Sequence, residues 1–352
     1  MAGSRAVTLG IAASQAPAMD PSRTPSPCFL VADIGGTNAR FALVDRAAAT
    51  PTLHAQRTLP CAEFASLQHA AEHYLAAVGA RPARAAIAVA SPVTGDAIRL
   101  TNRAWSFSTA ELRAALGLAR LTILNDFAAV AWAVPALDGG DRETLHGDPA
   151  APLAGPVSVL GPGTGLGVAL LVGDAARGWQ VVPTEGGHVT FAAIGDEERL
   201  VARWMDARHG RTSNERLLSG AGIAQIDAAL AAGTDSPTLD QLKAPLRDPA
   251  AIVAAALDGH DAVARRTLAR FCAVLGSVAG DCALLHGART VIIAGGIVPR
   301  FIPFLRASAF RERFLAKGRF AALLEGVAVH VVTHPMPGLL GAAVALHREE
   351  PA

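Results

Sequence analysis

Hydrophobic residues along the chain follow two spacings, and each predicts one kind of element. Apolar runs and alternating stretches predict strands at 29–32, 39–44, 85–90, 121–124, 159–160, 166–172, 291–294 and 327–332. Helical spacing predicts helices at 64–78, after a cap at Ser108, at 127–133, through most of 196–287 and at 339–347. Pro135 and the Gly139-Gly140 pair indicate a domain junction. Because strands and helices alternate, we expect an α/β fold with a mainly parallel sheet in each of two lobes.

The first predicted strand leads into a glycine-rich turn, and a second strand follows at once. Walker and dinucleotide-binding loops run from a strand into a helix, so this turn belongs to neither class. Gly35 and Gly36 would let backbone N–H groups approach phosphate oxygens. Asp33, at the strand end, is placed to hold Mg²⁺, through water. An ordinary hairpin turn is the alternative interpretation.

The same order of strand, glycine turn and strand returns in the second half of the chain. Gly163, Thr164 and Gly165 form the turn, and the two segments together resemble a weak internal repeat. Two copies of one nucleotide-gripping unit would hold a phosphate chain between two lobes, although glycine turns between strands also arise by chance. Gly295 and Gly296 follow another strand and would let adenine or ribose lie on the backbone.

Acidic and imidazole side chains supply candidates for a polyol site. Asn125 and Asp126 follow a strand at its carboxyl end, where open α/β sheets bind ligands. Asp126 could accept a proton from an alcohol, or it could cap the helix that follows. Glu185 and His188 flank two glycines and could converge on one small polyol, and Glu215 could reach the same ligand or be a surface charge.

The charge balance and the cysteine spacing bear on which partners and which cellular compartment the sequence favours. The chain has 31 basic and 30 acidic side chains, so no charge excess favours nucleic acid or an anionic membrane. The four cysteines, Cys28, Cys61, Cys272 and Cys282, show no C-x-x-C spacing. Reduced thiols in a cytoplasmic protein are the simplest interpretation.

The N-terminal residues carry a faint export-like pattern. An apolar stretch at 6–13 follows Arg5, but it is short, contains a glycine and is followed closely by prolines. We expect a disordered tail over 1–27. We also expect no membrane span, since charged residues, Gly or Pro interrupt every long apolar run.

Taken in chain order, these segments resemble bacterial glucokinase of the proteobacterial type, in the actin-like ATPase and sugar kinase superfamily. The matching stretches are ADIGGTNAR at 32–40, TNRAWSFS at 101–108, LNDF at 124–127, GTGLG at 163–167, EGGHV at 185–189, ERLLSG at 215–220, AGGIVPRF at 294–301, KGRF at 317–320 and GLLG at 338–341. A single motif could be accidental, whereas the ordered series from Cys28 almost to the C-terminus is highly specific.

The resemblance implies a two-lobed actin-like ATPase (ribonuclease H-like) fold, with the active-site cleft between a small and a large α/β domain. The small domain would comprise 28–136 plus 335–352, and the large domain 137–334. The implied activity is ATP-dependent phosphorylation of D-glucose to glucose 6-phosphate, in a cytoplasmic homodimer that closes on glucose and excludes water.

The resemblance also implies a role for each matching site residue. Asp126 would be the general base, and Mg²⁺ would be held at Asp33 through water. The residues implied to hold glucose are Asn125, Asp126, Glu185, His188 and Glu215. The residues implied to hold ATP are Ala32, Asp33, Ile34, Gly35, Gly36, Thr37, Asn38, Gly163, Thr164, Gly165, Gly295 and Gly296.

Two features depart from the family pattern. The extension of about 27 residues has no counterpart in it. Thr184 stands where the family usually has Gly, so its side chain could crowd the predicted sugar loop and weaken affinity.

Two other readings remain open. One is a kinase of the related repressor/open-reading-frame/kinase group, acting on another hexose or an N-acylhexosamine. That group usually has a Cys-rich zinc motif beside its sugar-binding His, and none follows His188. The other is a sugar-sensing regulator on the same fold, which would need a helix-turn-helix domain and a basic face.

Overall fold

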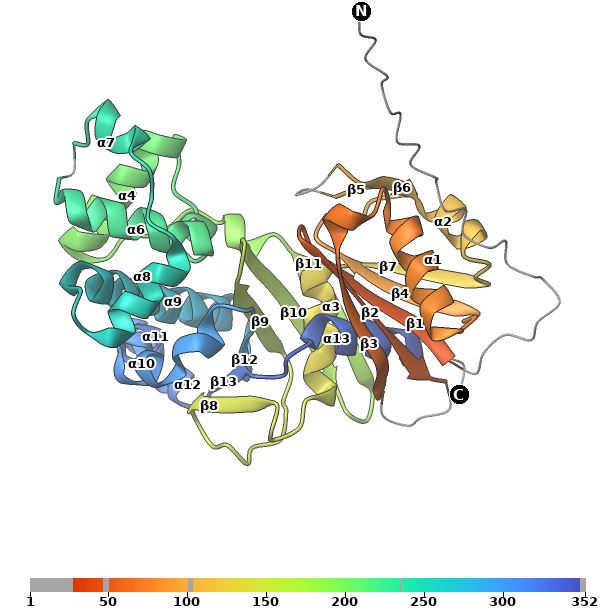
Figure 1. Ribbon diagram of the computed structural model, residues 1–352. Helices are drawn as coiled ribbons and strands as arrows, with labels where there is room; N and C mark the ends of the chain where they lie inside the picture. Colours follow the sequence, from red (N-terminus) through yellow and green to blue (C-terminus); the bar gives the residue numbers. More distant parts are fainter. Residues whose placement is uncertain (1–27, 47–50, 101–103, 235, 349–352) are drawn as a thin grey trace, which may run out of the picture.

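The computed structural model of the chain describes residues 28–46, 51–100, 104–234 and 236–348. The predicted tail at 1–27 lies outside the described residues, as do positions 101–103 of the TNRAWSFS stretch. Two large sheets form the body of the protein, with helices between and around them (Figure 1).

The first large sheet has five strands in the order β3-β2-β1-β4-β7. These strands are β1 (Cys28–Ile34), β2 (Asn38–Asp45), β3 (Leu53–Pro60), β4 (Arg84–Val89) and β7 (Arg120–Asn125). β1 pairs antiparallel with β2 and parallel with β4. Alternate side chains of β1 face opposite ways, so that Leu30 joins the core under α1 (Leu67–Val78) and Val31 packs against α13 (Pro337–Arg348). Because both faces are covered, β1 is apolar almost throughout.

The second large sheet repeats this arrangement. Its order is β11-β10-β9-β12-β13, with β8 added at the edge. β9 pairs antiparallel with β10 and parallel with β12, as β1 does with β2 and β4. The strands are β8 (Arg142–His146), β9 (Val157–Pro162), β10 (Leu166–Asp174), β11 (Gly178–Thr184), β12 (Thr290–Ile293) and β13 (Ala328–Val332). The predicted internal repeat is confirmed at the level of strand topology.

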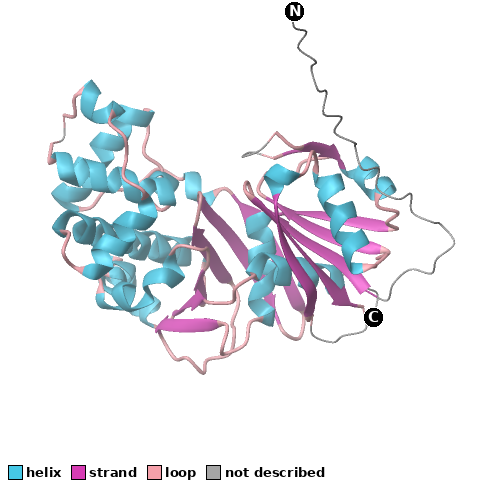
Figure 2. Cartoon of the chain, viewed as in Figure 1, coloured by secondary structure: helices cyan, strands magenta, loops and turns pink. Residues whose placement is uncertain are grey.

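Helices α4 to α12 gather on one side of the second sheet, away from the first sheet (Figure 2). They are α4 (Gly195–His209), α5 (Asn214–Leu217), α6 (Gly220–Ala232), α7 (Leu239–Lys243), α8 (Pro249–Asp258), α9 (Ala262–His286), α10 (Ile302–Ala307), α11 (Phe310–Leu315) and α12 (Ala321–Glu325). Leu160, Val291 and Ile293 of the sheet belong to the core beneath these helices.

Smaller elements complete the described chain. A hairpin of β5 (Ala97–Arg99) and β6 (Ser106–Ser108) leads into α2 (Thr109–Ala115). Ser108 Oγ accepts the N–H of Glu111 at 3.2 Å, which confirms the predicted cap. Short 3₁₀ helices lie at η1 (Cys61–Glu63), η2 (Val134–Ala136), η3 (Gly186–His188), η4 (Val298–Phe301) and η5 (Gly318–Phe320).

Helices α3 (Asp126–Ala133) and α13 lie between the two large sheets (Figure 1). Ala131 of α3 shares a core with β9 and β12 of the second sheet, whereas Leu339 of α13 packs on the first. The two helices touch through their backbones, because a Cβ at Gly341 would overlap the carbonyl oxygen of Ala129. The predicted domain boundary at 136/137 stays a prediction.

The sequence-based prediction omits β3, β8 and β11, and all three are edge strands. β3 is exposed along most of its length, so it lacks the apolar alternation that a half-buried strand shows. The hairpin strands β5 and β6 are also missing from the prediction. Helix α1 begins at Leu67 with Ser66 as its N-cap, three residues later than predicted.

Helix α9 is long and apolar enough to cross a membrane by those two criteria alone. However, 72% of its most apolar window is buried inside the protein. Its side chains, such as Phe271 and Leu275, belong to the core beneath the second sheet. Its middle, residues 271–280, is buried on every side, which is typical of a helix in the core of a protein.

We expect Gly341→Ala to destabilise the protein by about 2–3 kcal/mol, because the new methyl group would force α3 and α13 apart. This loss exceeds the gain of about 1 kcal/mol that alanine brings to a helix interior. Urea denaturation measures the difference. Gly139→Ala is the matched control, since nothing lies within 4 Å of a Cβ there. Equal stability of both variants would contradict a backbone contact at position 341.

Candidate active site

Asn125 and Asp126 occupy the junction between β7 and α3. Asn125 is the N-cap of α3, and its Oδ1 accepts the N–H groups of Phe127 and Ala128 at 3.0 and 3.1 Å. The alternative interpretation that Asp126 caps this helix is therefore wrong. Asp126 begins the first turn instead, and its Oδ1 accepts from Phe127 N at 2.8 Å and from Asn125 Nδ2 at 3.1 Å.

The Asp126 carboxyl is electrostatically perturbed. The pKa of Asp126 is raised to about 6, chiefly by burial; the N–H of Phe127 opposes this shift, and the negative charge of Asp33 adds to it. A carboxylate with a pKa near neutrality holds a proton well once it has taken one. This environment fits Asp126 to act as a base toward an alcohol.

Asp33 lies near the carboxyl end of β1. Arg40, its cross-strand partner on β2, approaches Asp33 Oδ2 to 3.3 Å. Burial raises the pKa of Asp33, and the Arg40 guanidinium lowers it. The first turn of α13 closes over this carboxyl, because a Cβ at Gly338 would lie 3.0 Å from both Cγ and Oδ2 of Asp33.

These two carboxyls fit a divalent cation. Each is desolvated, and the charge of Asp33 acts on Asp126, so a positive ion beside Asp33 would relieve both. Mg²⁺ prefers carboxylate and water oxygens and binds through one or two protein carboxylates. Asp33 is therefore a chemically suitable holder for it.

The first glycine turn is closed by a hydrogen bond from Gly35 N to Asn38 O at 3.0 Å. Thr37 is exposed at its tip. The side chains of Ala32 and Ile34 are fully buried in the core of the first sheet. Any contact of these two residues with a nucleotide would therefore have to use their backbone groups.

The structure brings the second and third glycine segments together. Gly295 has φ +88°, and a Cβ there would overlap the carbonyl oxygen of Pro162, directly before the 163–165 turn. Gly163 accepts a hydrogen bond from Gly220 N at 2.9 Å, which places the start of α6 at the same turn. Nothing lies within 4 Å of a Cβ at Gly296, so this surface is open.

Glu185, His188 and Glu215 converge at the start of β10. His188 Nε2 lies 3.7 Å from Glu185 Oε2, and His188 Nδ1 lies 3.7 Å from Glu215 Oε1. Glu215 Oε2 accepts the N–H of Leu166 at 2.9 Å, which fixes this carboxylate to the strand. The side chains of Glu185, His188 and Glu215 are 73%, 54% and 31% exposed, so they face solvent together.

Two positioning contacts were not predicted. Arg211 Nη1 donates to His188 O at 3.0 Å and to Thr190 Oγ1 at 3.2 Å, which holds the downstream end of the loop at 185–190, here called the Glu185 loop. The Phe127 ring fills the space left by two glycines, because a Cβ at Gly161 or Gly167 would overlap it. The sequence signal for this second contact is a pair of glycines inside otherwise apolar strands.

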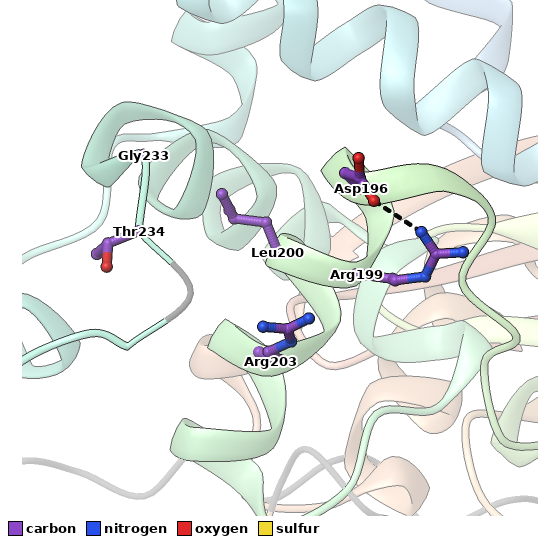
Figure 3. Close-up of a pocket in the computed structure, with 6 residues that line it drawn as sticks. All are labelled: Asp196, Arg199, Leu200, Arg203, Gly233 and Thr234. Atoms are coloured by element: carbon purple, nitrogen blue, oxygen red, sulfur yellow. Dashed lines mark hydrogen bonds and ion pairs between the residues drawn. The ribbon is translucent and has the colours of Figure 1, made fainter.

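Two hollows lie away from these residues. One, of about 400 Å³, is lined by α4 and the segment after α6, and its Arg199 pairs with Asp196 at 2.8 Å (Figure 3). The other, of about 480 Å³, lies around Pro156 and Gly173. None of the predicted site residues lines either one.

Across the part of the chain that the structure describes, no group of three or more His, Cys, Asp or Glu side chains is arranged to hold a metal ion. None of the four cysteines is in a disulfide, and three of them are buried. The described residues thus contain no counterpart of a Cys-rich zinc site beside His188.

Comparison with known proteins agrees with this arrangement. The family model described as Glucokinase matches residues 30–349. A glucokinase from Marinobacter nauticus is 43% identical over 323 residues, which covers 91% of this chain and 98% of that protein. A glucokinase from Cupriavidus pinatubonensis is 44% identical and covers 90% of this chain and 91% of its own length.

Solved structures agree as well. The crystal structure of a glucokinase from an Antarctic psychrotroph has a TM-score of 0.79 at 39% identity, covering 92% of this chain and all of that one. A Balamuthia mandrillaris glucokinase in complex with glucose, at 21% identity and a TM-score of 0.71, shows the shared fold. The expected two-domain actin-like ATPase fold is confirmed. The chain therefore belongs to the glucokinase family of sugar kinases.

Proposed function

We propose that the protein transfers the γ-phosphoryl group of ATP to the 6-hydroxyl of D-glucose, giving glucose 6-phosphate and ADP. The observation that carries the proposal is the pair of desolvated carboxyls, Asp33 and Asp126, at the carboxyl ends of β1 and β7. Phosphoryl transfer needs positioned phosphates, neutralised charge and a base near the accepting hydroxyl. The described residues offer a candidate for each.

Asp126 is the base in this proposal. Both of its hydrogen bonds from neighbouring residues fall on Oδ1, so we assign Oδ2 to the 6-hydroxyl proton. As that proton moves to Asp126, the hydroxyl oxygen forms a bond to the γ-phosphorus. The bond between the γ-phosphorus and the β–γ bridging oxygen breaks, and ADP leaves with that oxygen.

Glu185, His188 and Glu215 are assigned to the non-reacting hydroxyls of glucose. Glu185 and His188 are more than half exposed and Glu215 is partly exposed, which is consistent with an open form whose side chains are available to a sugar. Asn125 is assigned a sugar contact as well. Its amide already donates to Asp126 and, over 3.4 Å, to Ser91 O, so a sugar hydroxyl would replace this weaker bond.

The nucleotide is assigned to the three glycine segments. Backbone groups of residues 32–38 and 163–165 would hold the phosphates, and the open surface at Gly295 and Gly296 would hold the nucleoside. Mg²⁺, held by Asp33 through water, would offset the charge of the phosphates. When no cation is bound, Arg40, 3.3 Å from Asp33, offsets part of the charge of Asp33.

Three broader assignments belong to the same proposal. The small domain would comprise 28–136 plus 335–352, and the large domain 137–334, with closure on glucose excluding water as a competing acceptor. The family resemblance implies a cytoplasmic homodimer, whose mass sedimentation velocity would measure. It gives no reason to expect a nucleic-acid partner, in line with the balanced charge.

Substrate range tests the activity directly. In a coupled assay of ADP release with MgATP, we expect glucose to give a kcat/KM at least about 10-fold above those of mannose, fructose and N-acetylglucosamine. The physical reason is that Glu185, His188 and Glu215 are held in one fixed arrangement, which suits one arrangement of sugar hydroxyls better than others. Preference for N-acetylglucosamine or another hexose would favour the related kinase reading, and no turnover of any sugar would favour a regulator.

Replacing the base separates chemistry from binding. We expect Asp126→Asn to lower kcat by about 1000-fold or more while glucose affinity changes by less than about 5-fold, because a proton acceptor is lost and a hydrogen-bonding group stays. Steady-state kinetics and glucose titration measure the two effects. Asp258→Asn, on the exposed end of α8, is the control. A kcat near the wild-type value would remove Asp126 from this role.

The perturbed Asp126 carboxyl also links stability to pH. Its pKa is about 6 when folded, against 3.8 for an ordinary aspartate. The folded state therefore binds the Asp126 proton more tightly than the unfolded state does. This proton binding stabilises the fold fully below pH 3.8, and the stabilisation is lost as the pH rises through 6 and the buried carboxyl ionises. This difference in pKa between the folded and unfolded states corresponds to about 3 kcal/mol in the free energy of unfolding.

We therefore expect the metal-free Asp126→Asn variant to gain about 3 kcal/mol of stability relative to wild type as the pH is raised from about 3.5 to about 7.5. Urea denaturation at both pH values measures the gain, and other titrating groups cancel in the difference. A gain that does not change with pH would mean that Asp126 titrates normally.

A further inference from the structure

Thr184 is the last residue of β11 and the residue before the Glu185 loop. It is the direct cross-strand partner of Val168 on β10. Its hydroxyl donates to Val168 O at 2.8 Å and accepts the N–H of Gly186 at 3.2 Å. One side chain thus ties both the sheet and the first turn of the loop together.

The rest of the Glu185 loop is held from other directions. Its middle presses on β10, since a Cβ at Gly187 would overlap the carbonyl oxygen of Leu166. Its downstream end is bound by Arg211, which donates to His188 O. The two Thr184 bonds supply the corresponding anchor at the upstream end, next to Glu185.

We propose that Thr184 is a positioning residue that holds the Glu185 loop in its sugar-binding arrangement, a role that rests on the proposed function for its sugar readout. Without the two bonds, the loop would sample other conformations, and the apparent glucose affinity would fall in proportion to the competent fraction. Asp126 lies on α3, outside this loop, so the chemical step would be affected little. The effect belongs in KM rather than in kcat.

The expectation from the sequence is that the Thr184 side chain crowds the sugar and weakens glucose affinity, whereas in this proposal the same side chain strengthens it. Its hydroxyl is directed to the backbone of β10 and to Gly186, and the residue is only partly exposed. If the side chain crowded the sugar, a variant of the same volume would bind glucose as wild type does. If it anchors the loop, that variant would bind more weakly. Valine matches threonine in shape and lacks the hydroxyl.

The test compares Thr184→Val with Thr184→Ser in the full-length protein. With two hydrogen bonds of about 1 kcal/mol each lost, we expect Thr184→Val to raise the KM for glucose by about 10- to 30-fold with kcat within about 2-fold. Thr184→Ser, which keeps the hydroxyl, should bring KM back to within about 3-fold of wild type. Thr184→Ala provides a second hydroxyl-free variant if the valine protein folds poorly.

Hydrogen exchange supplies a readout that needs no sugar. In the sugar-free protein, the Gly186 amide should exchange about 10-fold faster in Thr184→Val than in wild type or Thr184→Ser. Unchanged exchange and KM in the valine variant, tighter glucose binding, or equal defects in the valine and serine variants would each overturn the proposal. A wild-type protein that fails to phosphorylate glucose would overturn the proposed function instead, while the exchange comparison would still decide the role of Thr184.

Discussion

The backbones of α3 and α13 touch between the two large sheets, and the placement of Asp33 and Asp126, the proposed catalytic groups, depends on this contact. It is as close as it is because Gly341 has no side chain to keep Ala129 away. Asp126 begins α3, and Gly338, one turn before Gly341 on α13, lies against Asp33. The helix pair therefore sets the position of one carboxyl relative to the other. The glycines that accept the Phe127 ring fix α3 to the second sheet in the same way.

In this arrangement both carboxyls are desolvated, and the negative charge of Asp33 acts on Asp126. Burial and mutual repulsion raise the pKa of Asp126, and Arg40 offsets only part of the charge on Asp33. Such a pair is less stable than ordinary surface carboxylates would be, and a site of this kind is where proteins commonly retain destabilising groups for chemistry. In the proposed reaction, Asp33 is paired with magnesium, through water, and Asp126 with the sugar hydroxyl once the magnesium–nucleotide complex and the sugar are bound.

The proposed sugar site is organised differently, by contacts of side chains and of one glycine with the backbone at one end of β10. Leu166 N fixes Glu215, Val168 O accepts from Thr184, and Leu166 O lies under Gly187. Strand β10 thus contacts, and fixes relative to one another, residues that are about 30 positions apart in the chain. The side chains of Glu185 and His188 remain exposed while the backbone of the Glu185 loop is held, so the loop is fixed without being covered.

Much of the site follows from the sequence, because its signals are local. Glycine turns after apolar strands, the cap at Ser108 and the ordered series of motifs predict the strand pairs, the repeat and the family. Edge strands such as β3 escaped prediction, because β3 is exposed on both of its sides and so shows no apolar alternation. Only the tertiary structure decided that Asn125 and not Asp126 caps α3, and that Gly295 meets the 163–165 turn. It also decided the pKa of Asp126 and the anchoring by Thr184. These features depend on desolvation and on contacts between residues far apart in the chain, which no local pattern encodes.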